Sequence, residues 1–458
     1  MTTSSGLHWS SRFTFLMAAV GCSVGLGNIW RFPYSAGVNG GGAFVLVYLA
    51  AVIVFALPIL MAELMVGRRG AASPPNAIAA VAAESGRSRK WRWMGILLGG
   101  IGAIIVLSFY SVVGGWTLAY AFKMAAGQLQ GISAEDAGRA FDELNGSPDS
   151  ILTWFVVFIG LTIFISTRGL HAGIERAVRV MMPALFFMLL AMVVYAAIVG
   201  DLGAALGFMF RPDFDKLDAK IVLGAFGQAF FSVSVGITNL MAYGAYIEKK
   251  TSLPRASGII AGADTLVAML AGLAIFPIIF AYGLEPGAGP GLAFITLPFA
   301  FGQIPGGLII GAAFFILLFF AALTSSIAMM EPPVSWLTDA TGLSRRSAAL
   351  LSGSISFVLG VLAALSFNVL GDFHPLGAIP IFAGKTFFAL FDYFVINLLM
   401  PFGGIVIAVF AGWMVKRQFS ADELFENQNL TAHRVWLFLV RFLAPVVLGY
   451  VLFDMATS

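Results

Sequence analysis

Long apolar runs, separated by short polar or glycine-rich stretches, repeat along almost the whole chain. A helix that crosses a bilayer needs about 20 mostly apolar residues, and the runs have roughly this length or more. The pattern predicts eleven spans, at 13–38, 43–67, 94–125, 151–166, 178–199, 221–246, 256–284, 306–336, 347–370, 380–415 and 435–453. We therefore expect an all-α polytopic membrane protein, with a single integral membrane domain over residues 1–458.

The composition excludes several protein classes. Hydrophobic residues make up 59% of the 458 residues and charged residues only 11%, against about a quarter charged in soluble domains. A net charge of +3 forms no basic face, so we expect no nucleic-acid partner. The single cysteine, Cys22, excludes an internal disulfide, and the four histidines show no metal-ligand spacing. A membrane-embedded enzyme would need a convergent acid, base or metal set, which no motif supplies.

Charge in the loops predicts the orientation. Basic residues gather in three alternate connections, at Arg68, Arg69, Arg87, Arg89, Lys90 and Arg92, at Lys249, Lys250 and Arg255, and at Lys416, Arg417 and Arg434. The connection between spans three and four is acidic, with Glu135, Asp136, Asp142, Glu143 and Asp149. Because cytoplasmic loops are enriched in lysine and arginine, we expect a cytoplasmic amino terminus. An odd number of spans then places the carboxyl terminus outside a bacterial inner (plasma) membrane.

Two of the predicted spans are interrupted. Span one contains GCSVGLGN at 21–28, and span six contains FSVSVG at 231–236. Glycine and serine weaken a helix and expose backbone groups, which is tolerated at membrane depth where the chain lines a cavity. Either motif alone fits close helix packing through small residues equally well. Five helices separate them, however, as expected for two inverted five-helix repeats, about 10–200 and 219–416, with an extra helix at about 435–453. Matching broken helices point to a transporter.

Four acids fall inside or at the edges of apolar spans: Glu63, Asp264, Glu331 and Asp392. Each needs a partner or a wet cavity. We expect Glu63 to accept hydrogen bonds from freed amides of a broken helix, and Glu331, before two prolines, to fix a helix bend. Asp264 has no basic neighbour in sequence, which favours a bound cation over a protonated acid. Hydroxyls at 324–326 are suitable cation ligands, but taken alone they fit back-bonding to the preceding turn better.

Several motifs keep their order along the chain: Trp9, GLGNIWRFPY at 25–34, NGGGAF at 39–44, Trp116, QAFFS at 228–232, ITLP at 295–298 and LTSS at 323–326. This set resembles the signature of the neurotransmitter:sodium symporters over essentially the whole chain. The resemblance, closest to the bacterial amino-acid branch, implies a LeuT-type fold. It also implies sodium-driven uptake of an amino-acid-like solute by alternating access.

The same resemblance implies two sodium sites. One would use backbone oxygens of Gly21, Val24 and Ala321 with the hydroxyls of Thr324 and Ser325. The other would use Ser23, Asn28, Ser232 and Asp264, with the substrate carboxylate as a further ligand. Because the substrate and the cation share this site, each would stabilise binding of the other. No organic cofactor is implied.

For the substrate, the resemblance implies a pocket lined by Cys22, Ser23, Gly25, Gly27, Val106, Tyr110, Phe231, Ser232, Ser234, Ile237, Ser325 and Met329. Amine-selective relatives carry an aspartate at the position of Gly25, so a zwitterion is expected here. Val106, Phe231, Ile237 and Met329 favour an apolar side chain of moderate size. A small amino sulfonate or a β- or γ-amino acid is the alternative.

The resemblance to the family also implies which residues form the gates. Arg31 and Asp392 match an outer ion-pair gate, and Trp9, Tyr246 and Asp339 match parts of the inner gate. The family's basic residue before the tryptophan is absent from 6–8, where the sequence reads GLH, and Arg12 is the candidate substitute.

Chloride-dependent relatives bind their anion with five residues, of which Tyr48, Gln228 and Ser232 match. Asp264 stands at the asparagine position and Ala268 at the second serine. A fixed negative charge would replace chloride, so chloride-independent transport is expected. Proton counter-transport is a further hypothesis.

Two other functions fit the same fold. A channel would need a continuous polar path, whereas the spans carry isolated polar residues. A substrate sensor would need a sizeable output domain, for which no loop is long enough. The expected partners are therefore the bilayer and a small zwitterion, with the protein a monomer or weak dimer.

Overall fold

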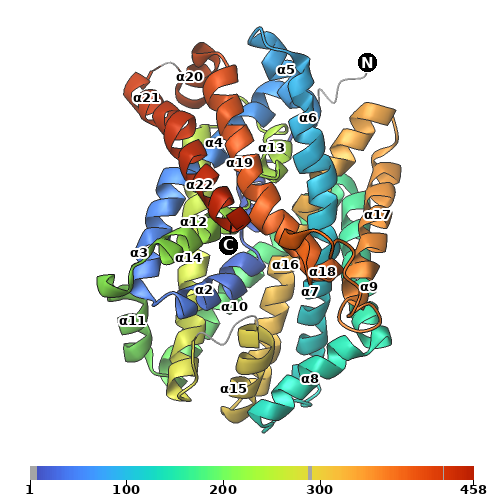
Figure 1. Cartoon of the computed structure of the whole chain (residues 1–458), viewed down its shortest axis with the longest axis vertical. Coiled ribbons are helices and arrows are strands. Elements are labelled where there is room, and N and C mark those ends of the chain that lie inside the picture. Colours follow the sequence, from blue (N-terminus) through green and yellow to red (C-terminus); the bar gives the residue numbers. More distant parts are fainter. Residues whose placement is uncertain (1–7, 287–290, 427, 458) are drawn as a thin grey trace.

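The computed structural model describes residues 8–286, 291–426 and 428–457, and the regular secondary structure of these residues is all helical (Figure 1). Within these ranges nine helices are long and apolar enough to cross a membrane, or ten when a bent pair counts as one span. The nine are Gly42–Gly70, Arg89–Ala125, Pro148–Thr167, Leu170–Val199, Leu253–Ala281, Gly307–Thr341, Arg345–Leu365, Phe387–Met414 and Leu430–Asp454. The order of segments follows the predicted apolar runs.

Several spans are built from α-helical pieces joined by π-helical turns. Span one comprises α1 (Arg12–Ser23), η1 (Gly27–Arg31) and α2 (Phe32–Val38), and span two α3 (Gly42–Ala51), η2 (Val52–Ala56) and α4 (Leu57–Gly70). Span three begins with a 3₁₀ turn, η3 (Arg89–Trp91), and continues with α6 (Arg92–Gly95), the π-helical η4 (Ile96–Gly102) and α7 (Ala103–Ala125). Span four is α9 (Pro148–Thr167). Span five comprises η5 (Leu170–Glu175) and α10 (Arg176–Val199).

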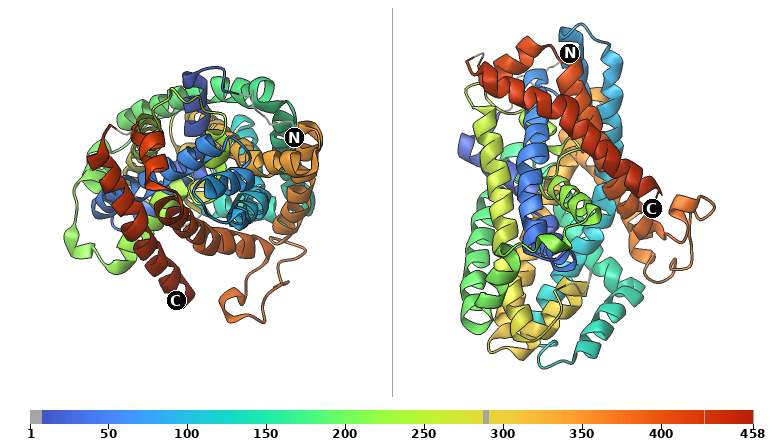
Figure 2. Two further views of the ribbon diagram at one scale, coloured as in Figure 1. Left: turned by 90° about the horizontal axis from the view of Figure 1, so that it is seen from above. Right: turned by 60° about the vertical axis from the view of Figure 1, so that its left-hand side comes forward.

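The second half continues in the same way. Segment six comprises α12 (Ala219–Ser232) and α13 (Asn239–Gly244), followed by α14 (Leu253–Ala281), α16 (Gly307–Thr341) and α17 (Arg345–Leu365). Span ten comprises α18 (Phe387–Tyr393), η9 (Phe394–Leu399), α19 (Met400–Val409) and η10 (Phe410–Met414). The last comprises α21 (Leu430–Phe438), η11 (Leu439–Leu443) and α22 (Ala444–Thr457), and it crosses the outside of the bundle obliquely (Figure 2, right).

Both predicted interruptions are present. The two parts of span one, Arg12–Ser23 and Gly27–Val38, meet at an angle of 50° because Val24 is extended. In segment six the helix ends at Ser232 and resumes at Asn239. Between them Ser234, Gly236 and Thr238 have positive φ angles, which no continuous helix allows. The repeat boundaries at 10–200 and 219–416 stay a prediction.

Short helices that the apolar pattern did not predict lie in the connections, except η8, which occupies the start of the predicted span 380–415 because the helix of that span begins only at Phe387. They are α5 (Pro74–Glu84), α8 (Ala134–Gly146), α11 (Leu202–Phe210), η6 (Phe214–Lys216), η7 (Leu292–Thr296), α15 (Leu297–Gln303), η8 (Pro380–Phe382) and α20 (Arg417–Phe425). Figure 1 places α5 and α20, beside the basic loops, at one end of the molecule and the acidic α8 at the other. Arg68 fastens α20 to the bundle, since its Nε lies 2.8 Å from Glu423 Oε2. The cytoplasmic assignment of the basic end remains a prediction.

Candidate functional site: a central cavity between two oxygen clusters

The break in span one creates free backbone groups that side chains of other spans satisfy. The Leu26 amide donates to the Tyr110 hydroxyl at 3.3 Å, and the Gly25 amide donates to Asn28 Oδ1 at 3.0 Å. Glycine is required at position 25 by the close approach of span eight. A Cβ there would lie 2.7 Å from Ser325 Oγ and 3.0 Å from the Tyr110 hydroxyl. A larger side chain at this position would have to displace one of these hydroxyls.

One oxygen cluster surrounds Asp264 on α14. Asn28 Nδ2 donates to Asp264 Oδ1 at 2.7 Å and to Ser232 Oγ at 2.8 Å, and Ser232 Oγ donates to Asp264 Oδ2 at 2.7 Å. Tyr48 adds its hydroxyl 3.2 Å from Ser232 Oγ. Ser23 joins from the side, donating at 3.1 Å to the carbonyl of Val233. Of the four residues predicted for the first sodium site, Asn28, Ser232 and Asp264 are thus hydrogen-bonded to one another, whereas Ser23 bonds to the carbonyl of the residue after Ser232. Each is 2% exposed or less.

A second oxygen cluster lies between the break of span one and α16. Ser325 Oγ is 3.3 Å from the carbonyl oxygens of both Gly21 and Val24. Thr324 Oγ1 donates to the carbonyl of Ala321 at 3.1 Å and to that of Phe320 at 2.9 Å. Thr324 therefore makes the back-bond that its helix predicts, whereas Ser325 reaches across to another span. Carbonyl and hydroxyl oxygens of this kind are suitable ligands for a hard cation such as sodium.

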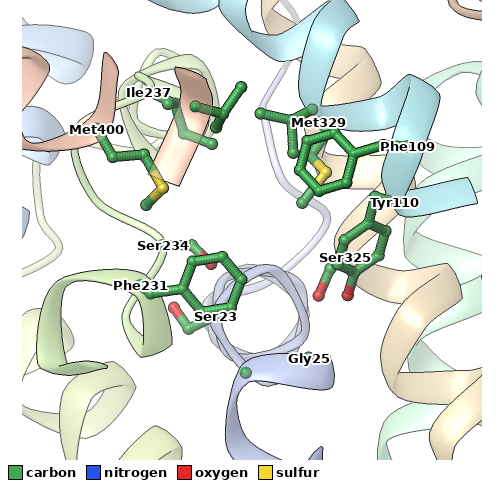
Figure 3. Close-up of a pocket in the computed structure, with 13 residues that line it drawn as sticks. Ser23, Gly25, Phe109, Tyr110, Phe231, Ser234, Ile237, Ser325, Met329 and Met400 are labelled. Atoms are coloured by element: carbon green, nitrogen blue, oxygen red, sulfur yellow. The ribbon is translucent and has the colours of Figure 1, made fainter. Parts of the chain in front are cut away.

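A cavity lies next to both clusters (Figure 3). It is lined by Ser23, Gly25, Gly27, Val106, Phe109, Tyr110, Phe231, Ser234, Ile237, Ser325, Met329, Val395 and Met400. Every predicted substrate residue belongs to this lining except Cys22 and Ser232. Figure 3 shows the hydroxyls of Tyr110 and Ser325 on one side and those of Ser23 and Ser234 beside Phe231. Ile237, Met400, Met329 and Phe109 line the end of the cavity away from Gly25 and make it apolar. Such a cavity suits a small molecule that is polar at one end.

Three lining residues were not predicted from the sequence. Phe109 directly precedes Tyr110, which the family resemblance predicted. This position beside Tyr110 was the only feature of the sequence that pointed to Phe109. Val395 and Met400 come from span ten, to which the sequence analysis assigned only the gate residue Asp392. They could have been found only from the packing of span ten against the break in segment six.

Glu63 has the structural role expected of it. Its carboxylate is fully buried and accepts hydrogen bonds from the amides of Gly236 at 2.8 Å and Met241 at 3.3 Å. These amides are free because segment six is broken between α12 and α13. A negatively charged acceptor is the strongest partner for such groups in an apolar surrounding.

On one side of the cavity, Arg31 and Phe231 form a layer. The guanidinium carbon of Arg31 lies 4.5 Å from the centre of the Phe231 ring, a cation–π contact. Arg31 and Asp392, both within the described residues, form no direct ion pair within 4.0 Å. A second cavity lies beside this layer and is lined in part by Arg31, Phe231 and Met400. Closure of the outer gate by Arg31 and Asp392 stays a prediction.

On the opposite side, Trp9 seals the bundle. Its Nε1 donates to the carbonyl of Tyr243 at 3.2 Å, and its ring packs edge-on against Tyr243 and Tyr246. The amide of Ser10 donates to Glu175 at 2.8 Å, which ties this segment to span five. Gly6 and Leu7, where the family has its basic residue, lie outside the described residues.

Tyr246 and Asp339, both predicted for the inner gate, bind different partners. The Tyr246 hydroxyl donates to Glu331 Oε1 at 2.7 Å, and Arg345 at the start of α17 makes a two-pronged ion pair with the same carboxylate. Asp339 accepts hydrogen bonds instead from the amide of Ser73 at 3.0 Å and from Asn76 at 3.3 Å. Glu331 thus forms an ion pair, in addition to the helix bend expected of it. Arg345 was not predicted from the sequence.

Known proteins resemble this chain along almost its whole length. The model of the sodium:neurotransmitter symporter family matches residues 7–136 and 143–458. The chain belongs to this family. It is 36% identical to an uncharacterised sodium-dependent transporter, YhdH, of Bacillus subtilis, over 98% of this chain and 97% of the relative. An uncharacterised sodium-dependent transporter of Haemophilus influenzae is 34% identical, over 98% of each chain.

A solved structure confirms the fold. The crystal structure of MhsT in complex with L-phenylalanine matches with a TM-score of 0.88 and 38% identity, covering 98% of this chain and 99% of MhsT. The LeuT-type fold predicted from the sequence is therefore correct. This symporter is a multi-pass, sodium-dependent membrane transporter and not an enzyme.

Proposed function

We propose that the symporter takes up an amino acid in its zwitterionic form, together with sodium, by alternating access. The central cavity carries this proposal, because it has hydroxyls near the break of span one and an apolar end away from Gly25. The substrate carboxylate would lie against Tyr110 and the break of span one, where the amino end of a half-helix favours negative charge. The L-phenylalanine bound in MhsT, whose fold this chain shares, supports an amino acid.

The corner at Gly25 supports a zwitterion over a monoamine. A monoamine needs a protein carboxylate to pair with its ammonium group. A side chain at position 25 would collide with Ser325 and Tyr110, so the pairing acid cannot come from there. The substrate therefore brings its own carboxylate. An amino sulfonate or β-amino acid has the same charges, and the apolar wall of Val106, Ile237 and Met329 favours an α-amino acid with an apolar side chain.

We assign the two oxygen clusters to two sodium ions. Asp264, Asn28, Ser232 and Ser23 would hold the first ion, next to the substrate carboxylate. The carbonyls of Gly21, Val24 and Ala321 with Thr324 and Ser325 would hold the second. Closing the second cluster joins span one to α16, so a bound ion would favour the state in which these spans are together.

Uptake into proteoliposomes of purified protein tests the proposal. An inward sodium gradient should drive accumulation of labelled phenylalanine or leucine, and potassium in place of sodium should abolish it. The matched control is phenethylamine, which lacks only the carboxylate of phenylalanine and should compete poorly. Equal competition by the amine and its parent amino acid would contradict the proposal.

A further inference from the structure

Span ten approaches the broken segment six more closely than side chains on both would allow. A Cβ at Gly236 would lie 2.6 Å from the carbonyl oxygen of Met400, and a Cβ at Gly403 would collide with the carbonyl oxygen of Gly236. Glycines at these positions let the two backbones touch. This contact fixes the start of α19, where Met400 is the first residue, against the wall of the substrate cavity.

The π-helical turn η9 also shapes span ten next to the substrate cavity. It widens span ten just before Met400, and such turns occur frequently at functional sites. Val395 within η9 faces the substrate cavity, while its neighbour Ile396 lines the second cavity beside Arg31. Span ten thus passes along the boundary between the two cavities.

Met400 lies on that boundary. Of the described residues, only Phe231 and Met400 line both cavities. Figure 3 shows Met400 on the same side of the substrate cavity as Phe231 and opposite Met329. Met400 is buried, with 4% of its surface exposed. Phe231 itself is fixed by Arg31 on its face and by the close approach of Gly27.

We propose that Met400 is a specificity-determining residue that closes the substrate cavity beside Phe231 and selects large, preferably aromatic, apolar side chains. Its thioether and that of Met329 face the apolar end of the cavity from two sides, and Phe109 adds a ring to this end. Methionine sulfur makes favourable contacts with aromatic rings and adapts its shape to them. A short side chain does not reach either thioether. The proposal rests on amino-acid uptake as the function.

The experiment compares phenylalanine with alanine as competitors of labelled substrate in proteoliposomes, for the native protein and two variants of Met400. Met400→Ala should reduce the preference for phenylalanine over alanine by about tenfold, because one missing group in an apolar pocket changes discrimination by this order. Met400→Val, which keeps more of the packing, should reduce it about threefold. The sodium dependence of alanine uptake should change less than twofold in both.

Met330→Ala and Met330→Val are the matched controls. Met330 is fully buried on α16 and lines neither cavity, so its variants should keep the native preference. An unchanged preference in either folded Met400 variant overturns the inference while leaving amino-acid uptake intact. If the native protein accumulates no amino acid in response to sodium, the proposed function fails first and this inference fails with it.

Discussion

Ser232 Oγ donates a 2.7 Å hydrogen bond to Oδ2 of Asp264, and both side chains are fully buried. Asn28 binds the other carboxylate oxygen, so Asp264 is held between two broken segments of the chain. Of the described residues, no lysine or arginine forms an ion pair with Asp264. Its charge therefore needs a cation or a proton, and this requirement gives the first prediction.

Transport is expected to be independent of chloride. A carboxylate at this position supplies negative charge near the first sodium and repels a chloride ion at short range. Uptake with gluconate in place of chloride should match uptake in chloride. Asp264→Asn should reduce uptake at least about tenfold in gluconate, since it removes one partner of a desolvated ion pair. Loss of native uptake without chloride would refute this assignment. Uptake that is unchanged in the Asp264→Asn variant would refute it as well.

The hydroxyls of Thr324 and Ser325 are expected to bind sodium. Replacing both with alanine removes two oxygen ligands that an apolar surrounding cannot replace. We expect the sodium concentration for half-maximal uptake to rise at least about tenfold, corresponding to about 1.4 kcal/mol. Ser326→Ala is the control, because Ser326 bonds to Thr162 and Leu323, outside this cluster. A double variant with native sodium dependence would exclude the site.

Gly25→Ala should reduce uptake at least about tenfold. The added methyl group would lie 2.7 Å from Ser325 Oγ and must displace either Ser325 or the break of span one. Overpacking of this kind costs about 1–3 kcal/mol. Gly262→Ala on α14, where a Cβ meets nothing within 4 Å, is the control and should transport normally. Both variants are compared by uptake per amount of protein in the membrane. Native uptake by Gly25→Ala would show that this corner tolerates a side chain.

Arg345 is expected to hold the inner side closed. It forms an ion pair with Glu331, which is 1% exposed. Glu331 also accepts a hydrogen bond from the hydroxyl of Tyr246, and Trp9 packs against the Tyr246 ring. Arg345→Ala leaves a buried carboxylate unpaired and should destabilise the closed state by about 3–5 kcal/mol. Cys22 is the only cysteine and is 1% exposed, so it reports opening.

We expect a small water-soluble thiol reagent to label Cys22 faster in the Arg345→Ala variant than in the native protein. Saturating substrate with sodium should slow this labelling. Arg346→Ala changes the adjacent, exposed arginine and should label at the native rate. Equal rates in all three proteins would show that the Glu331–Arg345 pair does not control access.

The sequence alone determined the membrane class, the positions of the spans and the two breaks. These follow from local properties: an apolar run of sufficient length crosses a bilayer, and glycine and serine inside it weaken the helix. The start of span five was less accurate, since the predicted 178–199 begins in the structure at Leu170 with a π-helical turn. The family resemblance named the residues of both oxygen clusters, of which Asn28, Ser232, Thr324 and Ser325 lie within its motifs.

Only the tertiary structure decided which distant residues meet. Glu331 pairs with Arg345 of the next span, Asp339 bonds to the loop after span two, and Met400 enters the cavity beside Phe231. None of these contacts has a local signal, because each depends on the angle and distance at which two helices pack. At Gly236 and Gly403 the backbones of segment six and span ten touch. Such an approach requires the absence of side chains on both partners at once, which neither segment reveals by itself.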